Sequence, residues 1–421
     1  MIFALLLAAV GAGAGTPSTP QALLEEVQRR AVCYFWQEAD PTTGLVLDRA
    51  NNRGPNRYAV ASLAATGFGL AALPVGVERG WLGRSDALER ARQTTRYVLN
   101  SLEHRHGWLY HFVDARTGER VWNCEISSID TALFLIGALF AAQYFEDTAL
   151  TESARALFER VDFNWMRTEG GARPEALTLS HGWTPERGFL PYRWDRYAEH
   201  LILYLLGIGS PTHPLPPESW FAWDRIVGEY AGYRTFAVGP LFVHQYNHLF
   251  VDFRCWEDPQ GWDYWTASVH ATLANRQYCL DQAAHYRSFG PNSWGLSACD
   301  GPDGYRAYGA PPGEPVCDGT VAVLAMLASY PFAPELVQAA AWYLFQTEGE
   351  RLWGRYGFAD SFNRDRGWYA TEVIGIDLGA ALLMIENARS GMVWRVAERI
   401  PALQAALNRI GFREKLPAEG R

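Results

Sequence analysis

The chain contains almost no lysine: among its 421 residues, Lys415 is the only one. A phosphate-binding lysine of the Walker type and a Schiff-base lysine are therefore both missing from any folded core. Acidic residues outnumber basic ones, 46 to 37, which gives a formal net charge of -9. A negative balance of this size argues against a nucleic acid or an anionic membrane as the partner.

Motifs that hold metals or activate nucleophiles are also scarce. The chain has six cysteines but no CxxC pair, no HExxH and no GxSxG. His244 and His248 lie four residues apart, but no third ligand accompanies them. In the segment 300–304, Pro302 and Gly304 stand where a calcium loop needs oxygen ligands. We therefore expect neither a metal nor a cofactor. If the protein is exported, some cysteines can pair, but their spacing does not give the connectivity.

Long apolar runs are limited to the first residues. Residues 1–17 combine a short apolar run with small residues, as in a signal peptide, although the basic start is missing. No later run is long and uninterrupted enough to predict a membrane span. We therefore expect a periplasmic or secreted protein whose residues 18–421 form a single domain, since 421 residues suffice for one large core.

Alternation of apolar and polar residues with period two is rare, whereas helical periodicity recurs along the whole chain. Amphipathic segments alternate with segments that are apolar on every side, and the second kind is typical of buried helices. The amphipathic segments are 21–39, 85–103, 150–163, 218–229, 262–286 and 334–346. The apolar segments are 58–73, 125–144, 192–206, 241–253, 319–330 and 371–385. A further charged helix is expected from residue 391 onward.

Six outer–inner pairs predict an all-α fold, an (α/α)₆ toroid in which an outer ring of helices encloses an inner ring. A stacked α-solenoid is the structural rival, but no fixed-period repeat is present. The long loops 104–122, 165–191, 287–316 and 349–370 all lead from an outer into an inner helix, so they should gather at one end of the barrel. Acids near the starts of inner helices point to the same end: Glu125, Asp130, Asp195, Glu199, Asp318, Glu372 and Asp377.

An acidic, aromatic, loop-walled end of this kind suits a carbohydrate. Aromatic residues make up 14% of the chain, and sugar rings stack on them while sugar hydroxyls bind charged groups. Glycoside hydrolysis needs one protonated and one ionised carboxyl. Glu199, just before a strongly apolar segment, fits the protonated one because burial raises a carboxyl pKa. Its structural alternative is an ion pair with Arg193 or Arg196. Asp360 and Asp300 are candidates for the partner, unless they cap turns.

Six ordered stretches resemble the glycoamylase-like family, the (α/α)₆ glycoside hydrolases that include the bacterial β-1,2-glucanases of family 144. The similar stretches are DPTTGLVLDR (40–49), YAEHLILYLLGIGSPTHP (197–214), LFVHQYNHLFVDFR (241–254), NSWGLSACDGPDGYRAYGAPP (292–312), DGTVAVLAMLASYPFAPE (318–335) and GWYATEVIGIDLGAALLMIENARSGMVWR (367–395). They run through nearly the whole chain, so they are specific for the family and less so for the substrate.

The resemblance implies hydrolysis of β-1,2-glucan or its oligosaccharides. We also expect a monomer that binds neither nucleic acid nor membrane. The resemblance implies Glu199 as the general acid and Asp360 as the base, in an inverting reaction whose base reaches water through a relay that includes a substrate hydroxyl. It also aligns Glu125 and Asp130 with an acidic cluster near the cleavage point. The remaining expected substrate contacts are Trp122, Trp183, Tyr192, Gln245, His248, Asp252, Arg254, Trp294, Asp300, Asp303 and Arg306.

Two other functions stay open at this point. The protein could be a retaining or transglycosylating β-glucan-active enzyme with a different linkage preference. It could also be an inactive glycan-binding protein on the same scaffold, although the presence of both carboxyl groups speaks against this.

Overall fold

The computed structural model describes residues 16–415, so the predicted signal peptide lies almost entirely outside the described residues. Helices dominate this part of the chain. Their bounds are α2 Pro20–Gln37, α3 Leu63–Glu78, α4 Arg84–Ser101, α5 Ser128–Phe145, α6 Thr148–Glu159, α7 Phe163–Thr168, α8 Leu201–Gly209, η1 Pro217–Phe221, α9 Leu241–Tyr246, α10 Tyr264–Asp281, α11 Val323–Ala328, α12 Pro334–Leu352, α13 Gly375–Ser390, α14 Met392–Ala397 and α15 Pro401–Ile410.

Short strands fill the loops between these helices, so the fold is mainly helical but not purely α as predicted. Their bounds are β1 Arg49–Asn51, β2 Val60–Ser62, β3 His104–Arg105, β4 Trp108–Leu109, β5 Phe112–Asp114, β6 Ile126–Ser127, β7 Gly182–Thr184, β8 Gly188–Phe189, β9 Val227–Tyr230, β10 Tyr233–Phe236, β11 Trp256–Glu257, β12 Ala298–Gly301, β13 Gly304–Ala307, β14 Val321–Ala322, β15 Trp353–Gly354, β16 Gly357–Phe358, β17 Ser361–Asn363, β18 Trp368–Tyr369, β19 Glu372–Ile374 and β20 Arg413–Glu414. All of their ladders are antiparallel.

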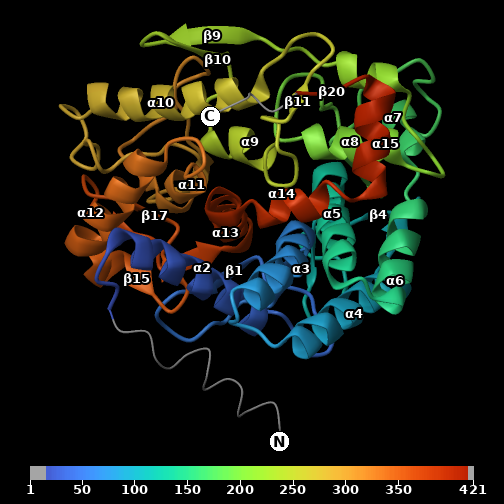
Figure 1. Cartoon of the computed structure of the whole chain (residues 1–421), viewed down its shortest axis with the longest axis horizontal. Helices are drawn as coiled ribbons and strands as arrows, with labels where there is room; N and C mark the ends of the chain where they lie inside the picture. The colour runs from blue at the N-terminus through green and yellow to red at the C-terminus, as the bar shows by residue number, and fades with distance from the viewer. Residues whose placement is uncertain (1–15, 416–421) are drawn as a thin grey trace, which may run out of the picture.

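The predicted alternation of outer and inner helices is visible in the structure. Helices α3, α5, α8, α9, α11 and α13 lie around the middle, and α2, α4, α6, α10 and α12 lie at the periphery (Figure 1). The inner helices are buried over most of their length, and most neighbours in the ring pack on one another. Helices α3 and α5 approach so closely that a Cβ on Gly137 would come within 2.1 Å of the carbonyl oxygen of Gly67. Only glycine allows this crossing.

Helix α5 also has the length and composition of a membrane span, with 18 residues and a mean hydropathy of 1.4. The prediction that no run after the leader reaches this length was therefore wrong. In the structure, 78% of this helix is buried inside the protein, as in the core helix of a large domain.

A ring of hydrogen bonds joins the starts of the inner helices. In each case the first backbone N–H of an inner helix donates to an oxygen atom of another loop or helix. The ring is closed because Gly375, at the start of α13, donates to Asp48 in the loop before α3. The six hydrogen bonds, each with the N–H donor first, are Leu63 to His111 O, Ser128 to His181 O, Leu201 to Asn247 Oδ1, Leu241 to Leu296 O, Val323 to Asp360 O, and Gly375 to Asp48 O. The four long loops contribute His111, His181, Leu296 and Asp360, which confirms that they meet at one end.

Three predicted helices differ from the observed structure. Residues 192–200 are not helical, because Arg193 and Arg196 bridge to Ser180 and Asp224, and α8 starts only at Leu201. In place of a helix over 218–229, the chain forms η1 and the hairpin β9–β10, whose turn has positive φ angles at Ala231 and Gly232. The C-terminal helix α15 packs against α8 and η1 instead (Figure 1).

The third difference is α9, which ends at Tyr246 although a helix was expected over 241–253. The side chain of Asn247 explains this ending. It donates to the carbonyl oxygens of Ala198 (2.9 Å) and Val243 (3.0 Å) and accepts from Leu201 N (3.1 Å). Asn247 therefore joins the end of α9 to the segment that leads into α8.

Candidate active site

Glu199 occupies the turn directly before α8. Its neighbours Tyr197 and His200 are buried, and the carbonyl of Ala198 is held by Asn247, so the backbone at Glu199 is fixed on both sides. The side chain is partly exposed, but the surrounding protein raises its pKa to about 7, and the charge of Asp130 adds to the rise. A carboxyl with this pKa is about half protonated at pH 7 and mostly protonated below it, so it can act as a general acid near neutral pH.

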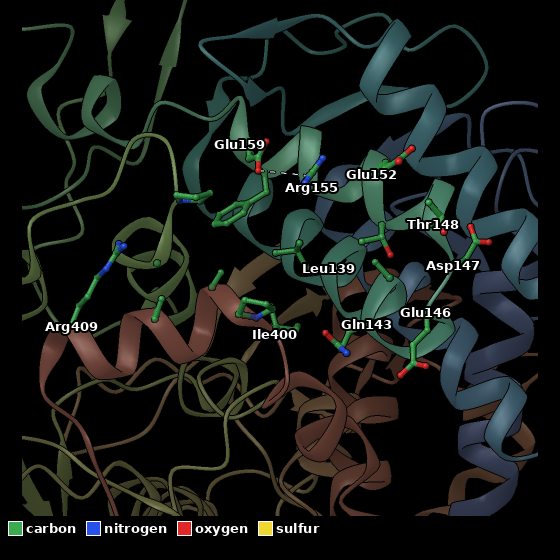
Figure 2. Close-up of a pocket in the computed structure, with 18 residues that line it drawn as sticks. Leu139, Gln143, Glu146, Asp147, Thr148, Glu152, Arg155, Glu159, Ile400 and Arg409 are labelled. Atoms are coloured by element: carbon green, nitrogen blue, oxygen red, sulfur yellow. Dashed lines mark ion pairs between the residues drawn. The ribbon is translucent and has the colours of Figure 1, made fainter.

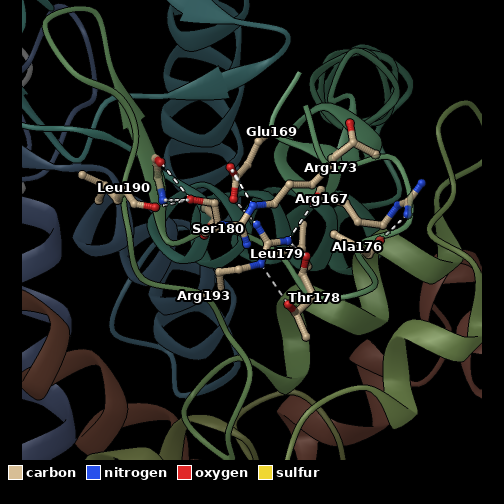
Figure 3. A network of polar contacts seen from close by, with 12 residues as sticks. Arg167, Glu169, Arg173, Ala176, Thr178, Leu179, Ser180, Leu190 and Arg193 are labelled. Carbon is tan, nitrogen blue, oxygen red and sulfur yellow. Dashed lines mark hydrogen bonds and ion pairs between the residues drawn. The ribbon is translucent and has the colours of Figure 1, made fainter. Parts of the chain in front are cut away.

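The structural alternative for Glu199, an ion pair with a nearby arginine, is not observed. Arg193 pairs with Glu169 and donates to Thr178 Oγ1 (3.0 Å) and to the carbonyl of Arg167 (2.7 Å). Figure 3 shows this network, in which the arginine side chains converge on the loop 165–191. Arg193 therefore holds that loop in place and leaves Glu199 without a counter-ion from this segment.

A histidine with two acids, here called the His111 cluster, lies beside Glu199. His111 Nδ1 lies 2.9 Å from Glu125 Oε1, and His111 Nε2 lies 3.4 Å from Asp130 Oδ1. Burial works against a charged His111, but Asp130 and Glu125 outweigh it and raise the pKa of the imidazole. Burial opposes charge on Glu125 too, but its contact with His111 lowers the pKa of that carboxyl. Burial raises the pKa of Asp130, which Ser127 Oγ contacts at 2.5 Å.

The His111 cluster is also where a metal ion would find ligands. One ligand atom from each of its three residues lies within 4.8 Å of the others, and residues 16–415 offer no second group of this kind. Both ring nitrogens of His111, however, already face carboxylates, and Asp130 is bound by Ser127. Hydrogen bonds and ion pairs among these side chains therefore explain why the three residues of the cluster lie so close together.

A second acidic group, the Arg49 cluster, consists of Asp48, Arg49, Asp300, Asp360 and Asp377. Arg49 pairs with Asp48 (3.0 Å) and Asp300 (2.9 Å). Asp360 is 1% exposed, and its Oδ2 accepts a hydrogen bond from the backbone N–H of Asp300 (2.8 Å). Burial raises the pKa of Asp360 to about 7, and the charge of Asp300 adds to this.

Tyr246, on α9, connects the two clusters. Its side chain is buried as a whole, and the pKa of its hydroxyl is raised well above the usual range by burial and then by Asp377, Tyr305, Glu199 and Asp130. Because acids from both clusters act on one hydroxyl group, Glu199 and the Arg49 cluster face a common space. Tyr305, at the end of the hairpin β12–β13, faces the same space: it is 52% exposed, yet the surrounding protein and Asp377 raise its pKa.

Exposed aromatic side chains lie on the loops next to the His111 cluster. Trp122 and Tyr192 are each 67% exposed, and Trp183 is half-buried beneath the guanidinium of Arg105. Trp122 and the following Asn123 both have left-handed backbone angles, φ 57° and 50°. Two such residues in a row are strained and need support, which Arg120 gives by donating to the carbonyls of Asn123 (2.7 Å) and Cys124 (2.6 Å).

We expect Trp122→Ala to raise the KM for a glucan by about 3- to 10-fold without changing kcat, because one stacking contact contributes about 1 kcal/mol. Steady-state kinetics measure this. Ile226→Ala is the matched control, since Ile226 is also apolar and 52% exposed but precedes β9 on another part of the surface. An unchanged KM for Trp122→Ala would exclude this tryptophan from the binding surface.

Three predicted substrate contacts lie inside the core, so their assignment is corrected. Trp294 and His248 are 0% exposed and Gln245 is 1% exposed. Gln245 donates to the carbonyl of Ala325 (2.6 Å) and to Ser329 Oγ (2.8 Å), and His248 contacts Ser268 Oγ at 3.0 Å. These polar groups join helices to one another, as buried polar groups usually do.

Asp252 and Arg254 are also misplaced by the prediction. They pair with each other (2.7 Å) beyond the end of α9, where they line a hollow of about 390 Å³ together with Ser390 and Trp394. Ser390 ends α13, whereas Asp377 lies in its first turn, so this hollow is at the opposite end of the inner helices. Asp303 and Arg306 are exposed on the hairpin β12–β13, and Asp303 pairs with Arg366 (3.2 Å).

A larger hollow of about 750 Å³ lies between α5, α6 and α15 (Figure 2). Leu139, Phe158 and Ile400 give it an apolar lining, and acids such as Glu146 and Glu152 stand around it. None of the predicted site residues lines this hollow. The chemistry therefore belongs to the end of the barrel where the inner helices begin.

The prediction missed several residues of the site: Asp48, Arg49, His111, Tyr246, Asp377 and Tyr305. Asp377 was expected at the correct end, but without a role. Arg49 is the last residue of the matched stretch 40–49, and this position was the one sequence feature that could have indicated its place in the site. Nothing in the sequence indicated that Tyr246 lies between two acidic clusters, because that depends on where α9 sits in the ring.

Comparison with known proteins places the chain beside β-1,2-glucan-degrading enzymes. Residues 191–401 match the family model described as "Putative glucoamylase". The chain is 26% identical to the exo β-1,2-glucooligosaccharide sophorohydrolase (non-reducing end) of Parabacteroides distasonis, with 94% of this chain and 58% of that protein covered. The chain thus spans little more than half of that relative.

Two solved structures are similar over nearly their whole length. One is the endo-β-1,2-glucanase from Chitinophaga pinensis in complex with sophorotriose and glucose, at 29% identity and a TM-score of 0.84, with 94% of this chain and 99% of that chain covered. The other, from Bacteroides uniformis, carries the same glucoamylase description, at 30% identity and a TM-score of 0.86, with 95% and 99% covered.

Proposed function

The chain belongs to the glycoamylase family, and we propose that it is a glycoside hydrolase that cleaves β-1,2-glucan or its oligosaccharides. The sophorohydrolase and the endo-β-1,2-glucanase named above act on β-1,2-linked glucans, and the similarity extends over most of this chain. The observation that carries the proposal is the pair of carboxyl groups with pKa values of about 7, Glu199 beside Asp130 and Asp360 beside Asp300.

In the proposed reaction, protonated Glu199 donates its proton to the glycosidic oxygen as the bond to the anomeric carbon breaks. Ionised Asp360 takes a proton from the attacking water, whose oxygen bonds to the anomeric carbon from the opposite face. Asp360 is only 1% exposed, so it is better placed to act through a relay than to touch the anomeric carbon itself. This burial favours inversion over the retaining alternative, in which Asp360 would be the nucleophile.

We extend the proposal to the fold, the domain organisation, the cellular location and the oligomeric state. The closed ring of hydrogen bonds at the starts of six inner helices supports an (α/α)₆ toroid, with α15 filling the place of the fourth outer helix. One hydrophobic core that runs from Leu23 to Phe412 supports a single domain over residues 18–421. We further propose that the protein is an exported monomer that works without a metal or cofactor.

We expect the protein to release reducing ends from linear β-1,2-glucan and not from β-1,3-, β-1,4- or α-1,4-linked glucans. Reducing-end assays on the four polymers measure this, and a product profile over time gives the size of the released sugars. Cleavage of α-1,4-glucan alone, or binding of β-1,2-glucan without turnover, would refute the proposed activity. Proton NMR of the first-formed anomer then separates inversion from retention.

A further inference from the structure

Asp377 is a buried acid that the proposed reaction does not use. It lies in the first turn of α13, is 5% exposed, and its Oδ2 has no hydrogen-bond partner in residues 16–415. An ionised carboxylate with a buried, unpaired oxygen is costly, whereas a neutral carboxylic acid in the same position loses much less on leaving water. The contacts of Asp377 therefore suit the neutral form.

The charged and titratable groups around Asp377 point the same way. Seven titratable or charged groups interact electrostatically with Asp377: Asp360, Asp300, Asp48, Arg49, Tyr246, Tyr305 and Cys299. Three of these are carboxyl groups, and Arg49 is the one cation. Burial and then Asp360, Asp300 and Asp48 raise the pKa of Asp377 well above its usual range. The start of α13 favours a charged Asp377, but one helix end does not offset burial beside three carboxyls.

Between Asp377 and Asp360, hydrogen bonds decide which one ionises first. Asp360 Oδ2 accepts from the backbone N–H of Asp300 (2.8 Å), and a hydrogen bond of this kind favours the charged form. Asp377 Oδ2 accepts nothing. When the two carboxyls share a single negative charge, it therefore resides on Asp360, and Asp377 keeps its proton.

We propose that Asp377 is a further substrate-binding residue that, as a neutral carboxylic acid, donates a hydrogen bond to a hydroxyl group of the glucan bound beside Asp360. Its Oδ2 is then the buried carbonyl oxygen, and Oδ1 carries the donated hydrogen. This inference rests on the proposed function for the identity of the ligand. It assigns the two neighbouring carboxyls different tasks: Asp360 accepts protons, and Asp377 donates a hydrogen bond without losing its proton.

Two variants test the proposal with linear β-1,2-glucan as the substrate. Asp377→Asn keeps the shape and offers an amide N–H₂ donor, so kcat/KM should stay within a few-fold of the wild type. Asp377→Leu keeps a similar branched shape but has no donor, so kcat/KM should fall by about 10- to 100-fold, mainly through KM. Equal losses in both variants, or none in the leucine variant, would overturn the assignment. Melting temperatures show whether each variant is folded.

The pH profile tests whether Asp377 is neutral in the wild type. If Asp377 is already neutral, Asp377→Asn leaves the charge beside Asp360 unchanged, and the acid limb of kcat/KM stays within about 0.3 pH units. If Asp377 is charged in the wild type, its removal lowers the pKa of Asp360, and the limb moves to lower pH by more than about one unit. The second result contradicts the proposal.

A measurement without substrate separates this inference from the proposed function. The infrared difference spectrum of wild type minus Asp377→Asn at neutral pH should contain the C=O stretch of a protonated carboxylic acid. If that band is absent, Asp377 is not neutral and the inference fails, whatever the enzyme cleaves. If the band is present but the wild type releases no sugar from β-1,2-glucan, the proposed substrate fails and Asp377 retains its protonated state.

Discussion

Glu199→Gln is expected to lower kcat on β-1,2-glucan by roughly 10²- to 10⁴-fold, the usual contribution of a general acid, while KM and the melting temperature stay close to the wild type. Glutamine has the shape of the protonated acid but cannot release a proton to the glycosidic oxygen. The loss should be much smaller on an aryl β-sophoroside with a nitrophenol leaving group, because nitrophenolate departs without protonation. Stopped assays on both substrates measure the ratio.

The pH dependence of the wild type tests the same assignment. Glu199, with a pKa of about 7, is active when protonated, so its contribution falls as the pH rises above 7. Asp360 is active when ionised, so its contribution falls as the pH drops below 7. A bell-shaped profile centred near pH 7 is expected, and its alkaline limb should disappear in Glu199→Gln. Glu229→Gln, on the exposed hairpin β9–β10, is the matched control and should behave as wild type.

Asp360→Asn is expected to reduce kcat by a similar factor, roughly 10²- to 10⁴-fold, but on both substrates alike. The water must be deprotonated whatever the leaving group is, so a reactive aryl glycoside gives no relief. Stability should be unchanged or higher, because the variant removes one buried acid beside Asp300 and Asp377, and the asparagine oxygen can still accept from Asp300 N. Kinetics on both substrates and thermal unfolding provide the measurements.

Asp86→Asn, in the exposed first turn of α4, is the control for this variant and should leave kcat unchanged. A loss on the polymer combined with full activity on the aryl substrate would assign Asp360 to leaving-group protonation instead. Full activity on both would remove it from the mechanism. The two variants together thus distinguish acid from base through the leaving group alone.

The helices that the sequence predicted best are those whose residue pattern and burial agree. Helices α2 and α4 have an amphipathic pattern, and each was placed within two residues of its observed bounds. The polar segment before Leu201 was predicted as helix because it leads directly into the apolar segment that follows. In the protein, those residues bridge to Ser180 and Asp224, which are distant in sequence. Periodicity does not report such contacts.

The candidate site shows the same division. Glu199 and Asp360 were assigned from the apolar segment after the acid and from the family resemblance. The comparisons confirm the family, and the roles of the two acids stay a prediction. His248 and Gln245 were expected at the substrate because they lie in the stretch 241–254, which matches the family. Their true partners, Ser268 and Ala325, lie on other helices, so only the packing shows that they are buried. The role of Arg49 likewise depends on Asp300, about 250 residues away in the chain.

The ring of hydrogen bonds at the starts of the inner helices has a mechanical consequence. Its acceptor carbonyls belong to Asp48, His111, His181 and Asp360, among others, so main-chain atoms of the site carry the bonds that join one helix to the next. If an inner helix moved along its axis, it would displace the main chain, and with it the side chain, of a residue in the site. The positions of these side chains are therefore set by the frame of the barrel rather than by the tips of its loops. Such a frame can keep its geometry while individual side chains are exchanged, and substrates can change without a change in the architecture.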